Sequence, residues 1–257
     1  MATPKEPHYF NHDMPRYRWF FDRADYLALF DGAGEAKVVG EASVQYLYST
    51  AAARAISEFN PGARILILLR NQEDFLPSYH SQLVFNDDEN VTDFARAWRM
   101  SGVRDRSNVG PDCREIRLLD YKAVGRFSEQ VERYLDCFSA SQVRILHFDA
   151  WTRDPRKAYL EMLGFFGLED DGRTDFPPIN EAHSRRSNAI ASFLRNPPSF
   201  LMRAVDAFRA STGMPKGLGA RLARINRRAG YASSLSDTLR REIRAYYRLD
   251  NEKLRGL

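Results

Sequence analysis

A five-residue apolar run, Ile65–Leu69, ends directly on Arg70 and constrains the fold more than any other segment of this 257-residue chain. Turn-forming Pro61 and Gly62 precede the run, and this combination is typical of a strand buried in a parallel sheet. Arg70 would then lie at the carboxyl end of the strand, where open α/β sheets bind ligands. Ser78 falls in the first turns of the next expected helix, where free N–H groups favour anions. The segment therefore predicts a phosphate-binding site.

Strand-like and helix-like segments alternate up to about residue 166, which predicts an α/β fold with a mainly parallel central sheet flanked by helices. The length, with 44% hydrophobic and 28% charged residues, is sufficient for one large domain. Further strands are expected at 38–41 and 143–148. Helices are expected at 19–30, 50–59, through Ser78 after the first strand, 91–100 with Thr92 as its N-cap, 124–138 and 156–166.

Residues 187–257 have a helical pattern, and we take these helices as packed on the same domain, so that 1–257 forms a single domain. Basic residues are concentrated from Arg195 to Arg228, within a net charge of only +4. This balance suits an anionic ligand without requiring nucleic acid as a partner. The basic helices fit contact with a membrane surface or an anionic acceptor, and a solvated arginine face on a packed helix explains them as well.

The two cysteines, Cys113 and Cys137, have neither CxxC nor zinc-type spacing, which favours a reducing compartment. The first ten residues lack the apolar core of a signal peptide, and no apolar stretch approaches the ~20 residues of a membrane span. No metal-ligand spacing is present, and the scattered histidines are interpreted as surface or core residues. The sequence therefore predicts a soluble, cytoplasmic protein without a metal site.

Several short motifs follow one another along the chain: K-E-P-H-Y-F at 5–10, G-E-A-S at 40–43, Arg70 with Ser78 eight residues later, a strand followed by Asp154-Pro155, and D-N-E-K-L at 250–254. Their order resembles that of the PAPS-dependent sulfotransferases, particularly the bacterial and heparan-sulfate-type branch. Each motif is weak alone, but the shared order and spacing make the match fairly specific. The resemblance covers most of the chain.

The resemblance implies a sulfotransferase fold related to the P-loop nucleotide hydrolases. It also implies transfer of a sulfuryl group from PAPS to a hydroxyl or amine, with adenosine 3′,5′-bisphosphate as product and no metal. A carbohydrate or a glycolipid is a candidate acceptor. By the same resemblance, Arg70 and Ser78 bind the 3′-phosphate of PAPS, a task for which a guanidinium fork and a hydroxyl are suited. The alternative is an Arg70 that forms a structural ion pair.

The resemblance further implies that Glu6 is the general base that deprotonates the acceptor, with Lys5 and His8 stabilising charge or orienting the acceptor. A solvated Lys-Glu pair near a chain terminus is the alternative reading. Arg185 and Arg186, which follow a Pro-Pro turn, would cover the nucleotide or the acceptor. A basic helix start on the surface explains these two arginines equally well.

Three departures from the family pattern concern the nucleotide site. Gln72 stands where the family has Pro, and Phe75 stands at a commonly basic position. The family's K-x-G-T-T/S loop, which holds the 5′-phosphosulfate, has no counterpart, because only four residues precede Lys5. We therefore expect that the sequence starts late, through a truncation or a misplaced gene start. The alternatives are a catalytically incomplete nucleotide-binding protein and a basic membrane-surface or partner-binding module.

Overall fold

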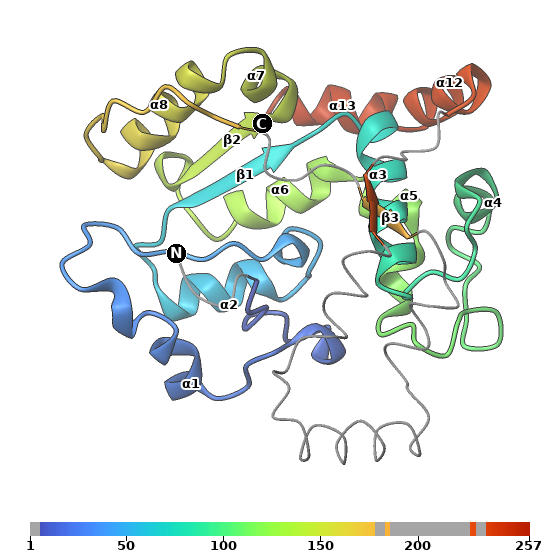
Figure 1. Cartoon of the computed structure of the whole chain (residues 1–257), viewed down its shortest axis with the longest axis horizontal. Helices are drawn as coiled ribbons and strands as arrows, with labels where there is room; N and C mark the ends of the chain where they lie inside the picture. The colour runs from blue at the N-terminus through green and yellow to red at the C-terminus, as the bar shows by residue number, and fades with distance from the viewer. Residues whose placement is uncertain (1–5, 178–182, 186–226, 230–234) are drawn as a thin grey trace, which may run out of the picture.

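The computed structural model describes residues 6–177, 183–185, 227–229 and 235–257. At its centre, strands β1 (Ile65–Leu69) and β2 (Val143–His147) pair in parallel, with Ile65 opposite Val143 and Leu69 opposite His147 (Figure 1). Both strands coincide closely with the segments expected from the sequence. A second, antiparallel pair consists of β3 (His183–Arg185) and β4 (Arg227–Ala229).

Helices account for most of the remaining regular structure. The α-helices are α1 (Arg23–Ala28), α2 (Ala52–Phe59), α3 (Gln72–Phe85), α4 (Phe94–Arg99), α5 (Tyr121–Val124), α6 (Phe127–Leu135), α7 (Phe148–Arg153), α8 (Pro155–Phe166), α12 (Asp237–Tyr246) and α13 (Arg248–Leu254). Short 3-10 helices lie at Pro15–Tyr17, Asp31–Ala33, Val44–Tyr46, Ile116–Leu119 and Ala140–Gln142. Among the described helices, none is long and apolar enough to cross a lipid bilayer.

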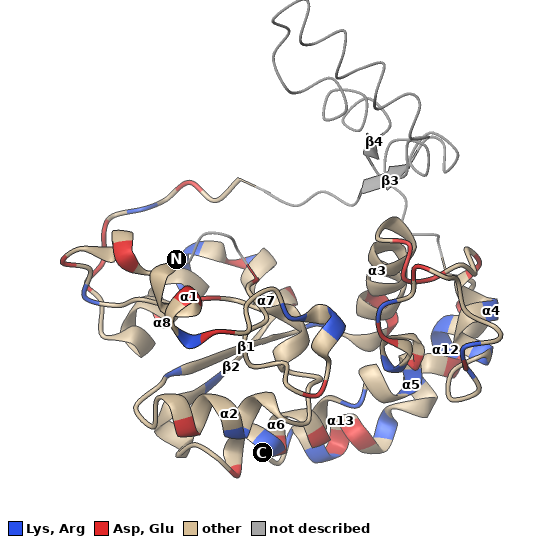
Figure 2. Ribbon diagram, turned by 90° about the horizontal axis from the view of Figure 1, so that it is seen from below, with Lys and Arg blue, Asp and Glu red and all other residues tan. Residues whose placement is uncertain are grey.

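The central sheet lies between two helical layers. Helices α2, α6 and α13 lie on one side and α7 with α8 on the other, as the views from two directions show (Figures 1 and 2). On the α6 side, Ile67 and Leu69 of β1 pack in one core cluster with Phe127 and Val131 of α6. Alternate residues of a strand face opposite sides, so Leu68 points away from this cluster and is 50% exposed.

A second core surrounds α3 and joins it to the last helices of the chain. Leu76 and Leu83 of α3 are buried together with Trp98, Ile243 and Tyr247. The Tyr247 hydroxyl donates to the backbone carbonyl of Tyr121, which satisfies its polar end inside this apolar cluster. Helices α12 and α13 thus pack on the same body as α3 and α6. Most of the basic cluster, residues 195–226, lies outside the described residues.

Four local expectations are wrong. Residues 227–229, within the stretch expected to be helical, form strand β4, which pairs with β3. Residues 38–41 form no strand: Val38 and Val39 are 40% and 46% exposed, because a two-residue apolar stretch before Gly40 offers too little surface to bury. The N-cap of α4 is Asp93, whose carboxylate accepts from the N–H of Arg96, and Thr92 precedes it. Helix α1 is shorter than 19–30 because Asp22 caps its start.

Candidate active site

The carboxyl edge of the central sheet carries the first group of candidate residues. Arg70 follows β1 directly, and Phe148 follows β2, so parallel pairing brings the two to the same edge. The Arg70 guanidinium carbon lies 5.0 Å from the centroid of the Phe148 ring, within cation–π range. Beside them, the amide of Asn71 donates to Oδ2 of Asp149 at 2.6 Å. The edge therefore presents an arginine whose guanidinium lies over an aromatic ring.

Arg70 has an unused donor. Its Nε is buried and has no hydrogen-bond partner among the described residues. Leaving a buried donor unpaired costs roughly 1–3 kcal/mol, a cost that a bound acceptor group removes. The two oxygens of a phosphate match the fork of a guanidinium. The expected alternative, a structural ion pair, is absent for Arg70 in the described part of the chain. Arg70 thus fits a phosphate ligand.

Helix α3 begins at this edge and carries Ser78 in its second turn, with the serine exposed. The N-cap residue Asn71 makes no side-chain hydrogen bond to the helix, and its amide nitrogen donates to Asp149 instead. The first N–H groups of α3 therefore have no side-chain cap, an arrangement that favours an anion. No hydrogen bond among the described residues joins Ser78 to Arg70.

The segment with Glu6 and His8 is held in a strained backbone conformation. Their φ angles are 62° and 51°, in the left-handed region, which costs a non-glycine residue roughly 1–3 kcal/mol. The His8 imidazole is buried, and its Nε2 lies 3.7 Å from Oε2 of Glu6. The backbone N–H of His8 donates to Oγ of Ser43 at 3.0 Å. This hydrogen bond fixes the segment against the G-E-A-S motif. Glu6 and His8 are thus brought together.

Glu41 is the residue that the sequence did not single out. Its carboxylate accepts hydrogen bonds from the hydroxyls of Tyr46 (2.6 Å), Ser43 (2.7 Å) and Tyr26 (3.3 Å). Burial raises the pKa of Glu41 above its ordinary value, although these hydroxyls and His8 pull the pKa down. Burial and the nearby Glu41 in turn raise the pKa of Tyr46. The only feature of the sequence that pointed to Glu41 was the G-E-A-S motif in which it lies.

The remaining candidates are less fully described. Arg185 is the last residue of β3. This strand lies against α3, and in its backbone register with β4 Arg185 is opposite Arg227. Lys5 and Arg186 lie outside the described residues. Arg70 and Ser78 have no hydrogen bond to His8 in the described part of the chain. Within those same residues, no three histidines, cysteines or acidic residues gather as a metal site.

Comparison with known proteins agrees with this geometry. The model of the sulfotransferase domain family matches residues 5–179. The crystal structure of a sulfotransferase from Alicyclobacillus acidocaldarius is 28% identical, with a TM-score of 0.59 over 85% of this chain and 87% of the other. No curated protein matches. The match to this structure, with the parallel pair β1 and β2, shows the α/β sulfotransferase fold. The chain belongs to the sulfotransferase family.

Proposed function

We propose that this sulfotransferase moves a sulfuryl group from PAPS to a hydroxyl or amine of an acceptor, and that Arg70 anchors the 3′-phosphate of PAPS. The observation that carries the proposal is the buried, unpartnered Nε of Arg70 at the carboxyl edge of the parallel sheet. Ser78 and the uncapped start of α3 would add hydrogen bonds to the same phosphate. The backbone of β3 beside α3 supports a role for Arg185, with Arg186, in covering the nucleotide.

PAPS supplies the sulfuryl group, and the chain's own residues would prepare the acceptor. Glu6 is the proposed general base, which accepts the acceptor's proton as the acceptor oxygen or nitrogen attacks. His8, 3.7 Å from Glu6, and Lys5 would orient the acceptor and stabilise developing charge. The strained backbone at Glu6 and His8 supports this role, because strain of this kind clusters at active sites.

The phosphate assignment is tested by Arg70→Ala. We expect affinity for adenosine 3′,5′-bisphosphate to fall by roughly 1.5–3 kcal/mol, the scale of a hydrogen bond to a charged group. Isothermal titration calorimetry measures this directly. A matched control is Arg144→Ala on β2, because Arg144 also lies over a phenylalanine ring, that of Phe165 at 5.8 Å, but is half exposed and paired with Glu161.

Equal affinity in the Arg70→Ala and wild-type proteins would refute Arg70 as the phosphate anchor. Turnover is read separately, by transfer of labelled sulfate from PAPS to acceptors. Bisphosphate binding without any transfer would favour a catalytically incomplete nucleotide-binding protein.

The state of the two cysteines supports a proposal for the cellular compartment of the protein. Cys113 and Cys137 are both free thiols in the structure. Free thiols are typical of a reducing compartment, and we place the enzyme in the cytoplasm. The basic segment from Arg195, proposed as a contact for a membrane surface or an anionic acceptor, lies mostly outside the described residues.

A further inference from the structure

Two acidic residues lie in the first turn of α3, shortly after the proposed phosphate anchor Arg70. Glu73 is the second residue of the helix and Asp74 is the third. Carboxylates at these positions commonly accept hydrogen bonds from the free N–H groups at a helix start. Among the described residues, neither carboxylate makes a hydrogen bond to the N–H groups of this turn. The helix start is therefore not capped by its own acidic residues.

Both carboxylates are instead bound by arginines of α12. Arg244 donates to both oxygens of Glu73, from Nε at 2.8 Å and from Nη2 at 2.6 Å. Arg240 donates from Nη1 to Oδ1 of Asp74 at 2.9 Å. The hydrogen bonds from Arg244 lower the pKa of the Glu73 carboxyl below its ordinary value, so this group is ionised at neutral pH. The two negative charges at the start of α3 are thus held and neutralised by a second helix.

The two arginines are placed on α12 for this contact. Arg240 and Arg244 are four residues apart, so they lie on one face of the helix, where like charges repel each other. Leu239 and Ile243, each one residue before an arginine, are buried in the core around α3 and fix the orientation of the helix. Ion pairs at such partly exposed positions add only modestly to stability. Stability alone therefore does not explain why the two positive charges are kept together.

A second contact joins the end of the chain to the same turn of α3. Gln72, the first residue of α3, and Asn251 of α13 exchange side-chain hydrogen bonds at 3.0 and 3.2 Å. Gln72 is buried and also donates to the carbonyl of Gly125 at 3.2 Å. Figure 1 shows α12 and α13 beside α3. The departure from the family pattern at Gln72 thus serves to fix α13 to the start of the phosphate helix.

An uncompensated carboxylate in this turn would oppose a bound phosphate in two ways. Asp74 and Ser78 are four residues apart and lie on the same face of α3, where a free negative charge repels an anion. A carboxylate released from its arginine could also accept from the first N–H groups of the helix, in place of a phosphate oxygen. The N–H groups of Gln72 and Glu73 have no hydrogen-bond partner in the described part of the chain. They are therefore available to a ligand.

We propose that the two α12 arginines, Arg240 and Arg244, are positioning residues for the nucleotide. By holding and neutralising the carboxylates of the first turn, they keep the start of α3 available to a phosphate. The arginines act through the two carboxylates and do not themselves contact the nucleotide. The identification of the anion as the 3′-phosphate of PAPS rests on the proposed function. The last helices of the chain thereby set the affinity of the nucleotide site.

Calorimetric titration of the full chain with adenosine 3′,5′-bisphosphate tests this proposal in three variants. The arginine variant carries Arg240→Gln and Arg244→Gln, the carboxylate variant carries Glu73→Ala and Asp74→Ala, and the combined variant carries all four substitutions. We expect the arginine variant to bind the bisphosphate about tenfold more weakly, the scale of uncompensated charge at a helix start. The combined variant should regain the affinity of the carboxylate variant, because no carboxylate is left to compete.

Arg248→Gln is the matched control. Arg248 is 66% exposed, against 65% for Arg244, and its partner Glu252 lies on α13 itself. This variant should bind the bisphosphate as the wild type does. The proposal is overturned if the arginine variant also binds like the wild type. It is equally overturned if the combined variant stays as weak as the arginine variant, the result expected of arginines that contact the phosphate directly or only stabilise the fold.

Salt provides a second measurement. The Debye length falls from about 10 Å at 0.1 M to about 3 Å at 1 M, so the difference between the arginine variant and the wild type should shrink over this range. A difference that does not change with salt would contradict the proposal. Weak binding by Arg70→Ala with wild-type binding by the arginine variant overturns this inference alone. Wild-type binding by Arg70→Ala refutes the anchor, and rescue in the combined variant then still supports the role of the arginines.

Discussion

Glu6 and Glu41 both interact with the buried His8, and the two carboxylates lie in different surroundings. Glu6 is near the ring nitrogen Nε2 and is about one-third exposed, so an acceptor can reach it. Glu41 receives three hydroxyl donors and is enclosed by tyrosines. We infer that Glu6 carries out proton transfer, whereas Glu41 and Ser43 hold the segment that presents it.

Glu6→Gln tests proton transfer at this residue. Glutamine has nearly the same shape but cannot take up the acceptor's proton, so turnover should fall by roughly 10²–10⁴-fold. Affinity for adenosine 3′,5′-bisphosphate should stay within error of the wild type. Steady-state kinetics and calorimetry measure the two quantities. Glu35→Gln, at an exposed residue, is the control, and wild-type turnover in Glu6→Gln would rule out Glu6 as the base.

Glu41 predicts a particular dependence of stability on pH. Burial raises its pKa in the folded chain above the ordinary 4.5, so the folded state holds the proton more tightly than the unfolded state. Its contribution to stability is full below pH 4.5 and is lost as the pH rises through the raised pKa. Glutamine does not titrate, so the stability of the Glu41→Gln protein should not show this decrease with rising pH.

The measurement is urea unfolding of both proteins between pH 4.5 and neutrality. The free energy of unfolding of the wild type, minus that of Glu41→Gln, should fall with rising pH by at most about 1.4 kcal/mol per unit. A difference that stays constant across this range would contradict the assignment of a raised pKa to Glu41.

At the scale of elements, α3 is where the sheet and the last helices of the chain meet. It leaves the carboxyl edge at Arg70, and its first-turn Glu73 and Asp74 pair with Arg244 and Arg240 of α12. These pairs are only partly buried, and each contributes modestly to stability. The buried contacts of Tyr247 matter more. A Cβ on Gly125, in the turn between α5 and α6, would lie 2.4 Å from the Tyr247 hydroxyl.

Gly125→Ala should therefore destabilise the protein by about 1–3 kcal/mol, the usual cost of forcing a group into a filled core. Gly164→Ala is the matched comparison, because Gly164 lies inside α8 and nothing is within 4 Å of an added Cβ. Alanine there should stabilise the helix by roughly 0.5–1 kcal/mol. Thermal and urea unfolding measure both changes. Equal effects of the two substitutions would show that Tyr247 does not restrict Gly125.

At the scale of the whole molecule, the sequence predicted elements that are encoded locally. β1 is a continuous apolar run after a turn. Helix α8 begins at Pro155 and is capped at its end by Gly167, whose φ of 70° suits glycine. The strand expected at 38–41 failed because two valines alone cannot specify burial. The position of Arg70 at the end of a parallel strand could be predicted because the apolar run that precedes it is continuous.

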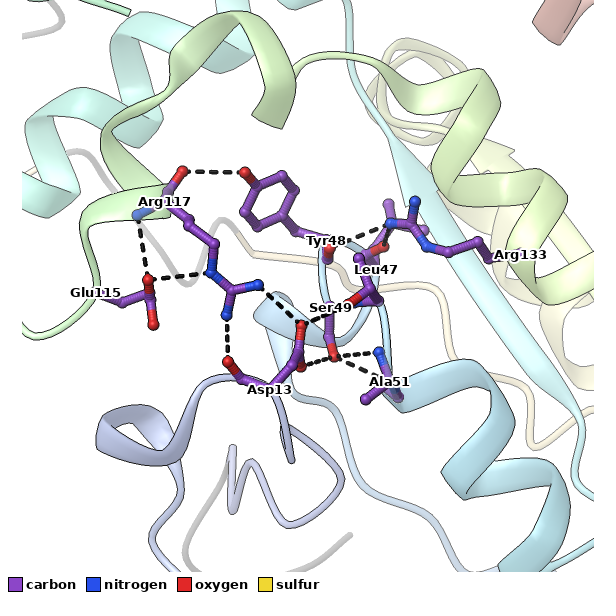
Figure 3. A network of polar contacts seen from close by, with 10 residues as sticks. Asp13, Leu47, Tyr48, Ser49, Ala51, Glu115, Arg117 and Arg133 are labelled. Atoms are coloured by element: carbon purple, nitrogen blue, oxygen red, sulfur yellow. Dashed lines mark hydrogen bonds and ion pairs between the residues drawn. The ribbon is translucent and has the colours of Figure 1, made fainter. Parts of the chain in front are cut away.

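The rest of the site depends on partners that are far apart in the chain. The Tyr48 hydroxyl donates to the carbonyl of Arg117 although 69 residues separate them (Figure 3). The role of Glu41 depends on Tyr26 and Tyr46, whose hydroxyls converge only after folding. Single-sequence patterns report periodicity and caps, and they carry no information on such convergence.

The burial of Ile243 and Tyr247 in the core around α3 has a consequence for biosynthesis. Arg244 of α12 and its partner Glu73 in α3 are 171 residues apart. During translation, α3 leaves the ribosome long before the helix that covers it, and Leu76 and Leu83 remain without their final neighbours for that interval. The nascent chain therefore exposes an apolar surface that a chaperone can bind until α12 has been synthesised.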